Sequence, residues 1–152
     1  MKPGAQIAGG SATRREVTGF SLIEMLISII VLTMGLLSVA GLTAKSLAAN
    51  DSSGYRASAG QLAMRISDAI RANRNAAFLG DYNMAIGASA PSLSAKAQAD
   101  LTTWKAALAT LPEGAGSVDF SAATRQATIV VRWNDQRAGG STASEFTYAF
   151  RP

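Results

Sequence analysis

The chain of 152 residues contains neither cysteine nor histidine. The lack of cysteine excludes a disulfide and a thiolate nucleophile, and the lack of histidine excludes imidazole bases and the commonest zinc ligands. The acidic residues are scattered singly, and the pairs Gly9-Gly10 and Gly139-Gly140 lack the following lysine and the strand-loop-helix setting of a phosphate-binding loop. The sequence therefore predicts no enzyme, no catalytic residue, no metal site and no cofactor.

Charged residues are also absent from a long apolar segment near the N-terminus. From Leu26 to Ala44 the chain reads LISIIVLTMGLLSVAGLTA, and no residue in this segment ionises. Together with the apolar residues just before it, the segment has the roughly 20 residues that cross about 30 Å of hydrocarbon as a helix. The sequence predicts a single membrane span over residues 20–44.

The basic residues on either side of this span predict its orientation. Lys2, Arg14 and Arg15 precede it, and Lys45 is the first charged residue after it. Because positively charged flanks are retained in the cytoplasm, we expect a cytoplasmic N-terminus and a C-terminal domain in the periplasm.

One acidic residue, Glu24, lies near the start of the span. A carboxylate in hydrocarbon costs roughly 2.5–3.5 kcal/mol on insertion scales, so Glu24 requires a partner. The nearest candidate is a free α-amino group on Phe20, which would exist if the chain were cut between Gly19 and Phe20.

The residues around this bond resemble a known signature. GFSLIEML, from Gly19 to Leu26, resembles the motif of type IV prepilins and type II secretion pseudopilins. The resemblance implies that residues 1–19 are a leader, that a prepilin peptidase cuts between Gly19 and Phe20, and that the Phe20 amine is N-methylated. It also implies that Glu24 pairs with the Phe20 amine of a neighbouring subunit during assembly.

Two other interpretations of the apolar segment remain open. An ordinary membrane anchor explains its length but gives no reason for Glu24. A secretory signal would use Arg14-Arg15 as its basic region and Ser38-Val39-Ala40 as its cleavage site, so that the mature chain began at Gly41. Its apolar core of about 18 residues would be longer than the usual 7–15 and would begin with a glutamate.

The net charge does not favour nucleic acid as a partner. The whole chain carries 14 basic and 10 acidic residues, a formal charge of +4. Loss of residues 1–19 removes three basic residues and one acidic residue, so 11 and 9 remain and the charge falls to +2. Exposed aromatic residues that alternate with the basic ones are also not evident, which argues further against nucleic acid.

The helix is predicted to continue beyond Lys45. Apolar and small residues recur with a spacing near 3.6, which is typical of one buried helix face. Gly80 is expected to cap a helix that runs from Phe20 to Phe78. The segment NDSSG, Asn50 to Gly54, is its weakest part, where a kink or local melting is expected. The predicted buried face comprises Leu47, Tyr55, Ala59, Leu62, Ile66, Ile70, Asn73 and Ala77.

The opposite helix face carries four arginines, Arg56, Arg65, Arg71 and Arg74. Such a pattern is typical of a solvated face, and it also suits a polar contact face for acidic neighbours or an anionic polymer.

A loop from Asp81 to Ala99 is predicted to follow the long helix. A second, short helix then runs to Thr110, with Asp100 as its N-cap and Trp104 as a core residue.

The last part of the chain alternates as β-strands do. The predicted inward sets are Val118 and Phe120, then Ile129, Val131 and Trp133, then Phe146, Tyr148 and Phe150. Short local connections favour an antiparallel meander. The polar segment Asn134–Ser141 is expected to form an exposed, mobile loop.

These elements predict an α+β, type IV pilin-like fold, in which a long N-terminal helix packs on a small antiparallel β-sheet. The first half of this helix forms the span. The predicted segments are a leader (residues 1–19), the span (20–44), the amphipathic helix half (45–80) and the remainder of the globular domain (81–152).

Three further segments resemble PilV-type minor pilins, the type IV pilus modification proteins. They are Gln61–Asn83, Asp100–Pro112 and Val130–Asp135. The resemblance implies a structural subunit that joins other minor pilins and the major pilin, at the inner-membrane assembly platform, to prime the pilus. The subunit would leave the inner membrane for the pilus at the cell surface. Unlike many such proteins, this chain has no cysteines around the loop before Asp100.

Three alternative functions remain open. A minor pseudopilin of a type II secretion system would share the N-terminal motif. A DNA-capturing pilin would use the four helix arginines together with Arg132 and Arg137 as phosphate contacts. An adhesive pilin would use the Asn134–Ser141 loop.

Overall fold

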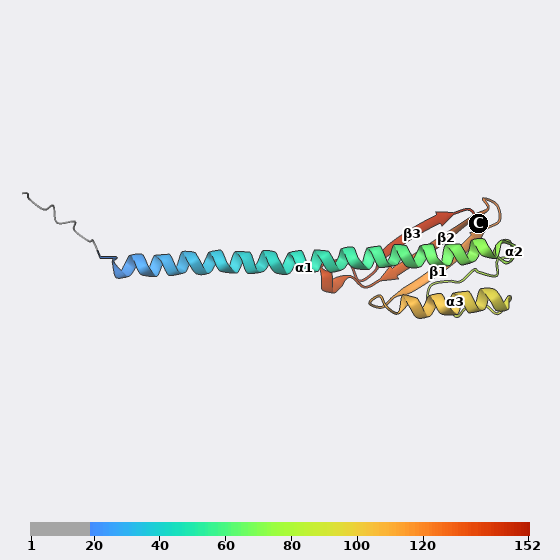
Figure 1. The fold of residues 1–152 in the computed structure, drawn as a ribbon, viewed down its shortest axis with the longest axis horizontal. Helices are drawn as coiled ribbons and strands as arrows, with labels where there is room; N and C mark the ends of the chain where they lie inside the picture. The colour runs from blue at the N-terminus through green and yellow to red at the C-terminus, as the bar shows by residue number, and fades with distance from the viewer. Residues whose placement is uncertain (1–18) are drawn as a thin grey trace, which may run out of the picture. The chain divides into compact units, whose positions relative to one another are not determined.

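The computed structural model describes residues 19–152, so the predicted leader before Gly19 lies outside the described part of the chain. The chain divides into two compact units between Ala40 and Gly41. The long helix α1 belongs to both, and all other elements belong to the second unit (Figure 1). The elements are α1 (Leu22–Ala72), α2 (Arg74–Phe78), α3 (Ala95–Leu108), β1 (Ala115–Ser121), β2 (Gln126–Trp133), the 3₁₀ helix η1 (Gln136–Ala138) and β3 (Ser144–Phe150).

In the first unit, α1 begins at Leu22, two residues later than the sequence predicted. Ser21 ends the preceding coil, and its carbonyl accepts hydrogen bonds from the backbone N–H groups of Glu24 (3.0 Å) and Met25 (3.1 Å). The bond from Met25 is the first regular bond of the helix, and the bond from Glu24 satisfies one of the donors that a helix N-terminus leaves open.

In the second unit, one face of α1 is buried in the core. Its buried residues Ala59, Ala63, Ile66 and Ile70 recur every three or four positions, which confirms the predicted amphipathic pattern. The prediction was wrong for Leu47, which is 63% exposed, because the sheet does not extend back to that turn. Phe146 packs beside the start of the buried face, where a Cβ on Gly60 would make ordinary van der Waals contact with its ring at 3.7 Å.

The helix is unbroken through Asn50–Gly54, so the predicted kink there is wrong. The break lies instead at Asn73, between α1 and α2. The end of α2 confirms the predicted glycine cap: Gly80 has a left-handed φ of 82°, its N–H donates to Ala77, and the N–H of Asp81 donates to Ala76. These two bonds form a Schellman motif, which only glycine enters without strain.

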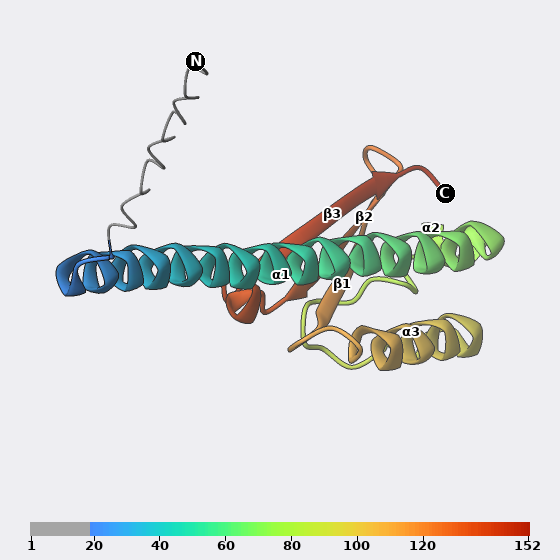
Figure 2. The ribbon, with the colours of Figure 1, turned by 60° about the vertical axis from the view of Figure 1, so that its left-hand side comes forward.

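The three strands form an antiparallel meander in the order β1-β2-β3, as the sequence predicted. Ile129 lies at the centre, opposite Val118 on β1 and Tyr148 on β3. The alternate residues Ile129, Val131 and Trp133 are buried, and Phe146 packs against the same core. Figures 1 and 2 show that the part of α1 in this unit runs along the sheet, with α3 beside it.

Helix α3 begins earlier than predicted, and its N-cap is Ser94 rather than Asp100. The Ser94 hydroxyl accepts from the backbone N–H of Ala97. Trp104 is only 2% exposed, and its indole N–H donates to the Leu62 carbonyl at 3.0 Å, which ties α3 to α1. The prediction that Trp104 is a core residue is confirmed.

Two segments predicted as loops are tied to the core. Met84 pairs with Val118 through backbone hydrogen bonds, and the Asn83 side chain accepts from the N–H of Phe120, so the outer edge of β1 is covered. In the Asn134–Ser141 segment, Asp135 is buried and accepts a 2.5 Å hydrogen bond from the Ser52 hydroxyl on α1. The expectation of a wholly exposed loop was therefore wrong at Asp135.

A polar chain joins α1, the following loop and α3. The hydroxyl of Tyr82 donates to Asp100 at 2.8 Å and accepts from the Asn73 side chain at 3.3 Å. Asp100 also pairs with Lys96. Tyr82 is buried, and this burial raises the pKa of its phenol from 10.0 to about 12.

We expect Tyr82→Phe to lower the free energy of unfolding by about 1–2 kcal/mol, because Asp100 loses a donor in a largely buried setting. The contribution of Tyr82 to the free energy of unfolding depends on pH. Tyrosine ionises near pH 10 when unfolded and near pH 12 in the fold, so its contribution is complete below pH 10 and is lost between pH 10 and 12. Urea unfolding of both proteins should therefore show a difference that shrinks across this range. A constant difference would contradict the assignment.

Candidate functional site

Glu24 lies in the first turn of α1 with its side chain exposed. Its carboxylate makes no hydrogen bond or ion pair with any residue between 19 and 152. The helix dipole favours an acid here by about 0.3–1 kcal/mol, which is less than the roughly 2.5–3.5 kcal/mol cost of placing it in hydrocarbon. The described chain alone therefore leaves this charge uncompensated.

The other polar side chains of α1 up to Ala40 are satisfied within the helix. The hydroxyls of Ser28, Thr33 and Ser38 donate to backbone carbonyls three or four residues earlier, at 2.7, 2.8 and 2.9 Å. Such back-bonding is what hydroxyls need in a membrane, where water is absent. Glu24 is thus the exception in this segment.

The apolar side chains of the same segment have no cover within the described chain. The large apolar residues from Phe20 to Leu42 are all exposed. Helix α1 is long and apolar enough to cross a membrane, and its most apolar window is not buried. Lipid or the helices of other subunits must cover these side chains, because exposed apolar patches of this size are rare in soluble monomers.

The four predicted arginines are exposed but do not share one environment. At about 100° per residue, Arg65 points roughly opposite to Arg56. Arg71 faces β3: its guanidinium pairs with Asp68 at 3.3 Å and donates to the Tyr148 hydroxyl at 3.4 Å. The bond to Tyr148 raises the pKa of Arg71.

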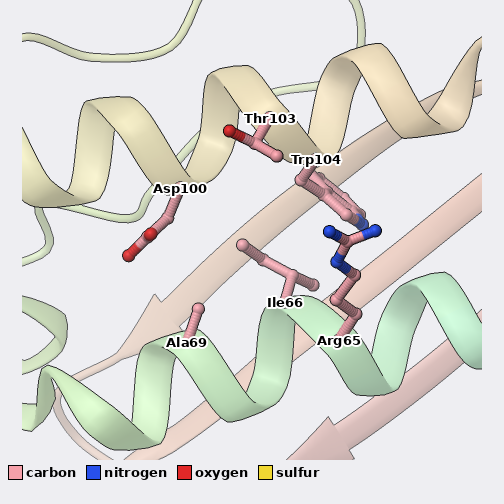
Figure 3. Close-up of a pocket in the computed structure, with 6 residues that line it drawn as sticks. All are labelled: Arg65, Ile66, Ala69, Asp100, Thr103 and Trp104. Carbon is pink, nitrogen blue, oxygen red and sulfur yellow. The ribbon is translucent and has the colours of Figure 1, made fainter.

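Arg65 lines a shallow cleft between α1 and α3, of about 150 Å³. Figure 3 shows Arg65 and Trp104 pointing toward one another from the two helices, with Ile66 between them and Asp100. The Asp100 carboxylate accepts a hydrogen bond from Tyr82 and pairs with Lys96. The cleft therefore offers a contact surface between the two helices.

Arg74 has neighbours that sequence spacing did not reveal. Arg125, in the turn between β1 and β2, and Arg151, after β3, line the same surface hollow as Arg74. They come from three separate parts of the chain, so no helical period relates them. Their positions become evident only in the folded sheet.

The geometry combines an uncovered apolar helix with one unpaired carboxylate beside the Gly19-Phe20 bond. Residues 14–40 match the family model described as the prokaryotic N-terminal methylation motif. The segment is a prepilin-type motif. The methylation motif covers less than a fifth of the chain and supports a type IV pilin-like protein. No curated protein and no solved structure matches the chain.

The methylation motif agrees with the interpretation of Gly19 to Leu26 made from the sequence. It covers the N-terminal segment alone. Proteins with this motif are structural subunits.

Proposed function

We propose that this chain is a minor pilin, a structural subunit that takes part in priming type IV pilus assembly. The observation that carries the proposal is the unpaired Glu24 carboxylate in the first turn of an uncovered apolar helix, inside a methylation motif. A subunit of this kind has no catalytic activity of its own. It acts by placing charges and apolar surface against its neighbours.

In this proposal the prepilin peptidase cuts between Gly19 and Phe20 and the new Phe20 amine is N-methylated. The methylated amine remains protonated near neutral pH. Glu24 of one subunit then pairs with the Phe20 amine of the next, so that neither charge is left unpaired in hydrocarbon. Since the pair forms only in one alignment, it sets the axial position of each subunit.

Close helix packing in the filament would follow from small residues along α1. A Cβ added at Gly35 or Gly41 would have no neighbour within 4 Å in the described chain, so that surface is open to another helix. Small residues allow helix backbones to approach closely in membranes. The proposed contact stripe comprises Ala40, Gly41, Ala44, Ala48 and Ala49.

Before assembly the subunit would reside in the bacterial inner membrane, with a cytoplasmic N-terminus and a periplasmic domain, as the flanking charges favour. Its partners would be other minor pilins, the major pilin and the inner-membrane assembly platform. Within this class we favour a PilV-type minor pilin, on the resemblance of the segments from Gln61 to Asp135.

A minor pseudopilin of a type II secretion system is the second candidate, because the same methylation motif serves both systems. Co-purification of the full-length chain distinguishes the two. Recovery with minor pilins supports the proposal, whereas recovery with pseudopilins supports the alternative.

The first test of the proposal is the N-terminus of the mature protein. We expect mass spectrometry of filament-associated chain to show N-methylated Phe20 as the first residue. Gly19→Val should keep its leader, because the motif requires glycine at the cleaved bond. Gly35→Val, which fills open space in the same helix, should be processed normally. An intact leader, or a mature chain that begins at Gly41, in cells with working fibres would contradict the proposal.

A further inference from the structure

Three arginines gather at the end of the second unit where α2 terminates. Arg74 on α2, Arg125 in the β1–β2 turn and Arg151 after β3 line one hollow of about 370 Å³ together with Phe78. Phe78 and Arg125 also line an adjoining hollow of about 310 Å³ with Phe120. We call Arg74, Arg125, Arg151 and Phe78 the arginine cluster.

The positive charge of the arginine cluster is not compensated within the described chain. None of its three arginines forms an ion pair with a residue between 19 and 152. No acidic side chain lines either hollow; Pro152, which carries the terminal carboxylate, also lines the larger one without an ion pair to these arginines. Like charges that share a surface destabilise the fold, so this arrangement favours an anionic partner from outside.

The backbone of Arg125 has a conformation that is uncommon for an arginine. Its φ is 52°, in the left-handed region that glycine and asparagine adopt readily and that costs other residues about 1 kcal/mol. An arginine at this position is therefore unfavourable for the turn. Strain of this kind is tolerated where the side chain serves a function.

An aromatic ring lies among these charges. Phe78 is 43% exposed, its ring contacts Phe120 edge-to-face at 5.5 Å, and the Arg74 guanidinium lies 5.9 Å from its centroid. Exposed aromatic rings beside arginines bind single-stranded nucleic acids, through base stacking and phosphate contacts.

We propose that the arginine cluster binds single-stranded DNA. Lipid headgroups are a poor alternative, because Arg74 lies about 40 Å along the helix from Lys45, where the predicted span ends. An acidic protein surface is the other candidate partner, and competition with poly-glutamate distinguishes it from DNA. The low net charge of the whole chain does not exclude this binding, because phosphate groups interact with the local charge of the three arginines.

The test measures binding of a fluorescent oligo-dT of about 20 nucleotides to the full-length chain in a neutral detergent. Three phosphate contacts predict that log K falls with log[salt] with a slope of about −2. Arg125→Asn should weaken binding about tenfold at low salt and reduce the slope by about 0.7. It should leave the melting temperature unchanged or raise it, because asparagine tolerates the left-handed backbone.

Arg137→Asn is the matched control, since it removes the same charge from an exposed site on η1. The sequence alone suggested Arg137 as a phosphate contact, but it lines neither hollow of the arginine cluster. It should leave DNA affinity unchanged. Equal loss of affinity in both variants would show general attraction and overturn the proposal. Displacement of the oligonucleotide by poly-glutamate at equal charge concentration would also overturn it, in favour of an acidic protein. Neither result bears on cleavage at Gly19, so the proposed assembly function is tested separately.

Discussion

Glu24→Ala is expected to be cleaved and methylated like the wild-type chain, yet to fall at least tenfold in the assembled fraction. The variant leaves the Phe20 amine of the neighbouring subunit without its counter-charge in hydrocarbon. An unpaired charge there costs roughly 2.5–3.5 kcal/mol, and each 1.4 kcal/mol corresponds to about a tenfold change in equilibrium. Quantitative immunoblots of sheared filaments against membranes measure the effect.

Three variants sharpen this result. Glu24→Gln keeps the size and hydrogen-bonding capacity of the side chain without its charge, so it should fail like Glu24→Ala if the pairing is ionic. Glu24→Asp keeps the charge on a shorter side chain and should assemble better than either. Glu16→Ala removes the same charge from the leader and should have no effect once the leader is gone. Wild-type incorporation of Glu24→Ala would refute the pairing.

The Glu24 prediction depends on a motif that could be recognised from sequence, because its residues follow one another directly along the chain. The same is true of the strands. Alternation at Ile129, Val131 and Trp133 reports burial on one face of a sheet, and the structure confirms it. Such patterns depend on a residue's immediate neighbours and on little else.

The N-cap of α3 could not be assigned in this way. Ser94 and Asp100 are both good capping residues that precede apolar positions, so sequence alone does not separate them. The choice depends on Tyr82, which binds the Asp100 carboxylate inside the helix and comes from a different segment.

The predicted kink at Asn50–Gly54 failed for a similar reason. Glycine and small polar residues weaken a helix locally, but here Ser52 is hydrogen-bonded to Asp135, 83 residues later. The same contact explains why an aspartate in a polar, glycine-rich segment is buried. The hydrogen bond between Ser52 and Asp135 therefore outweighs the low helix propensity around Ser52 and the preference of Asp135 for solvent.

The grouping of the arginines on the surface could not be predicted from the sequence. Helical spacing grouped Arg56, Arg65, Arg71 and Arg74, yet β3 engages Arg71 and the α3 cleft contains Arg65. Arg125 and Arg151 join Arg74 only because the sheet brings a turn and the chain's last strand to the end of α2. No periodicity links these positions.

The largest effect on stability is expected at Gly114, between α3 and β1. A Cβ there would lie 1.9 Å from the carbonyl oxygen of Leu108 and 2.9 Å from its carbonyl carbon. Because the obstacle is backbone, a rotamer change cannot relieve it. Overpacking typically costs 1–3 kcal/mol, so we expect Gly114→Ala to lose about 3 kcal/mol or more. Thermal unfolding should then shift down by roughly 10–20 °C.

Gly54→Ala is the matched control for this prediction. It makes the same substitution, so its effect on the unfolded chain is comparable. Nothing lies within 4 Å of a Cβ at Gly54, and the residue is inside a helix, so stability should rise by about 0.5–1 kcal/mol. Equal melting temperatures for the two variants would contradict the packing at Gly114.

The Gly114 and Glu24 variants also separate two ways of losing assembly. Gly114→Ala should lower both the melting temperature of the second unit and the amount of chain in filaments, since neighbours need a folded domain to contact. Glu24→Ala should lower incorporation alone, because Glu24 lies in the first turn of α1, in the first unit. If Glu24→Ala also lowered the melting temperature, its assembly defect would have to be attributed to the fold and not to charge pairing between subunits.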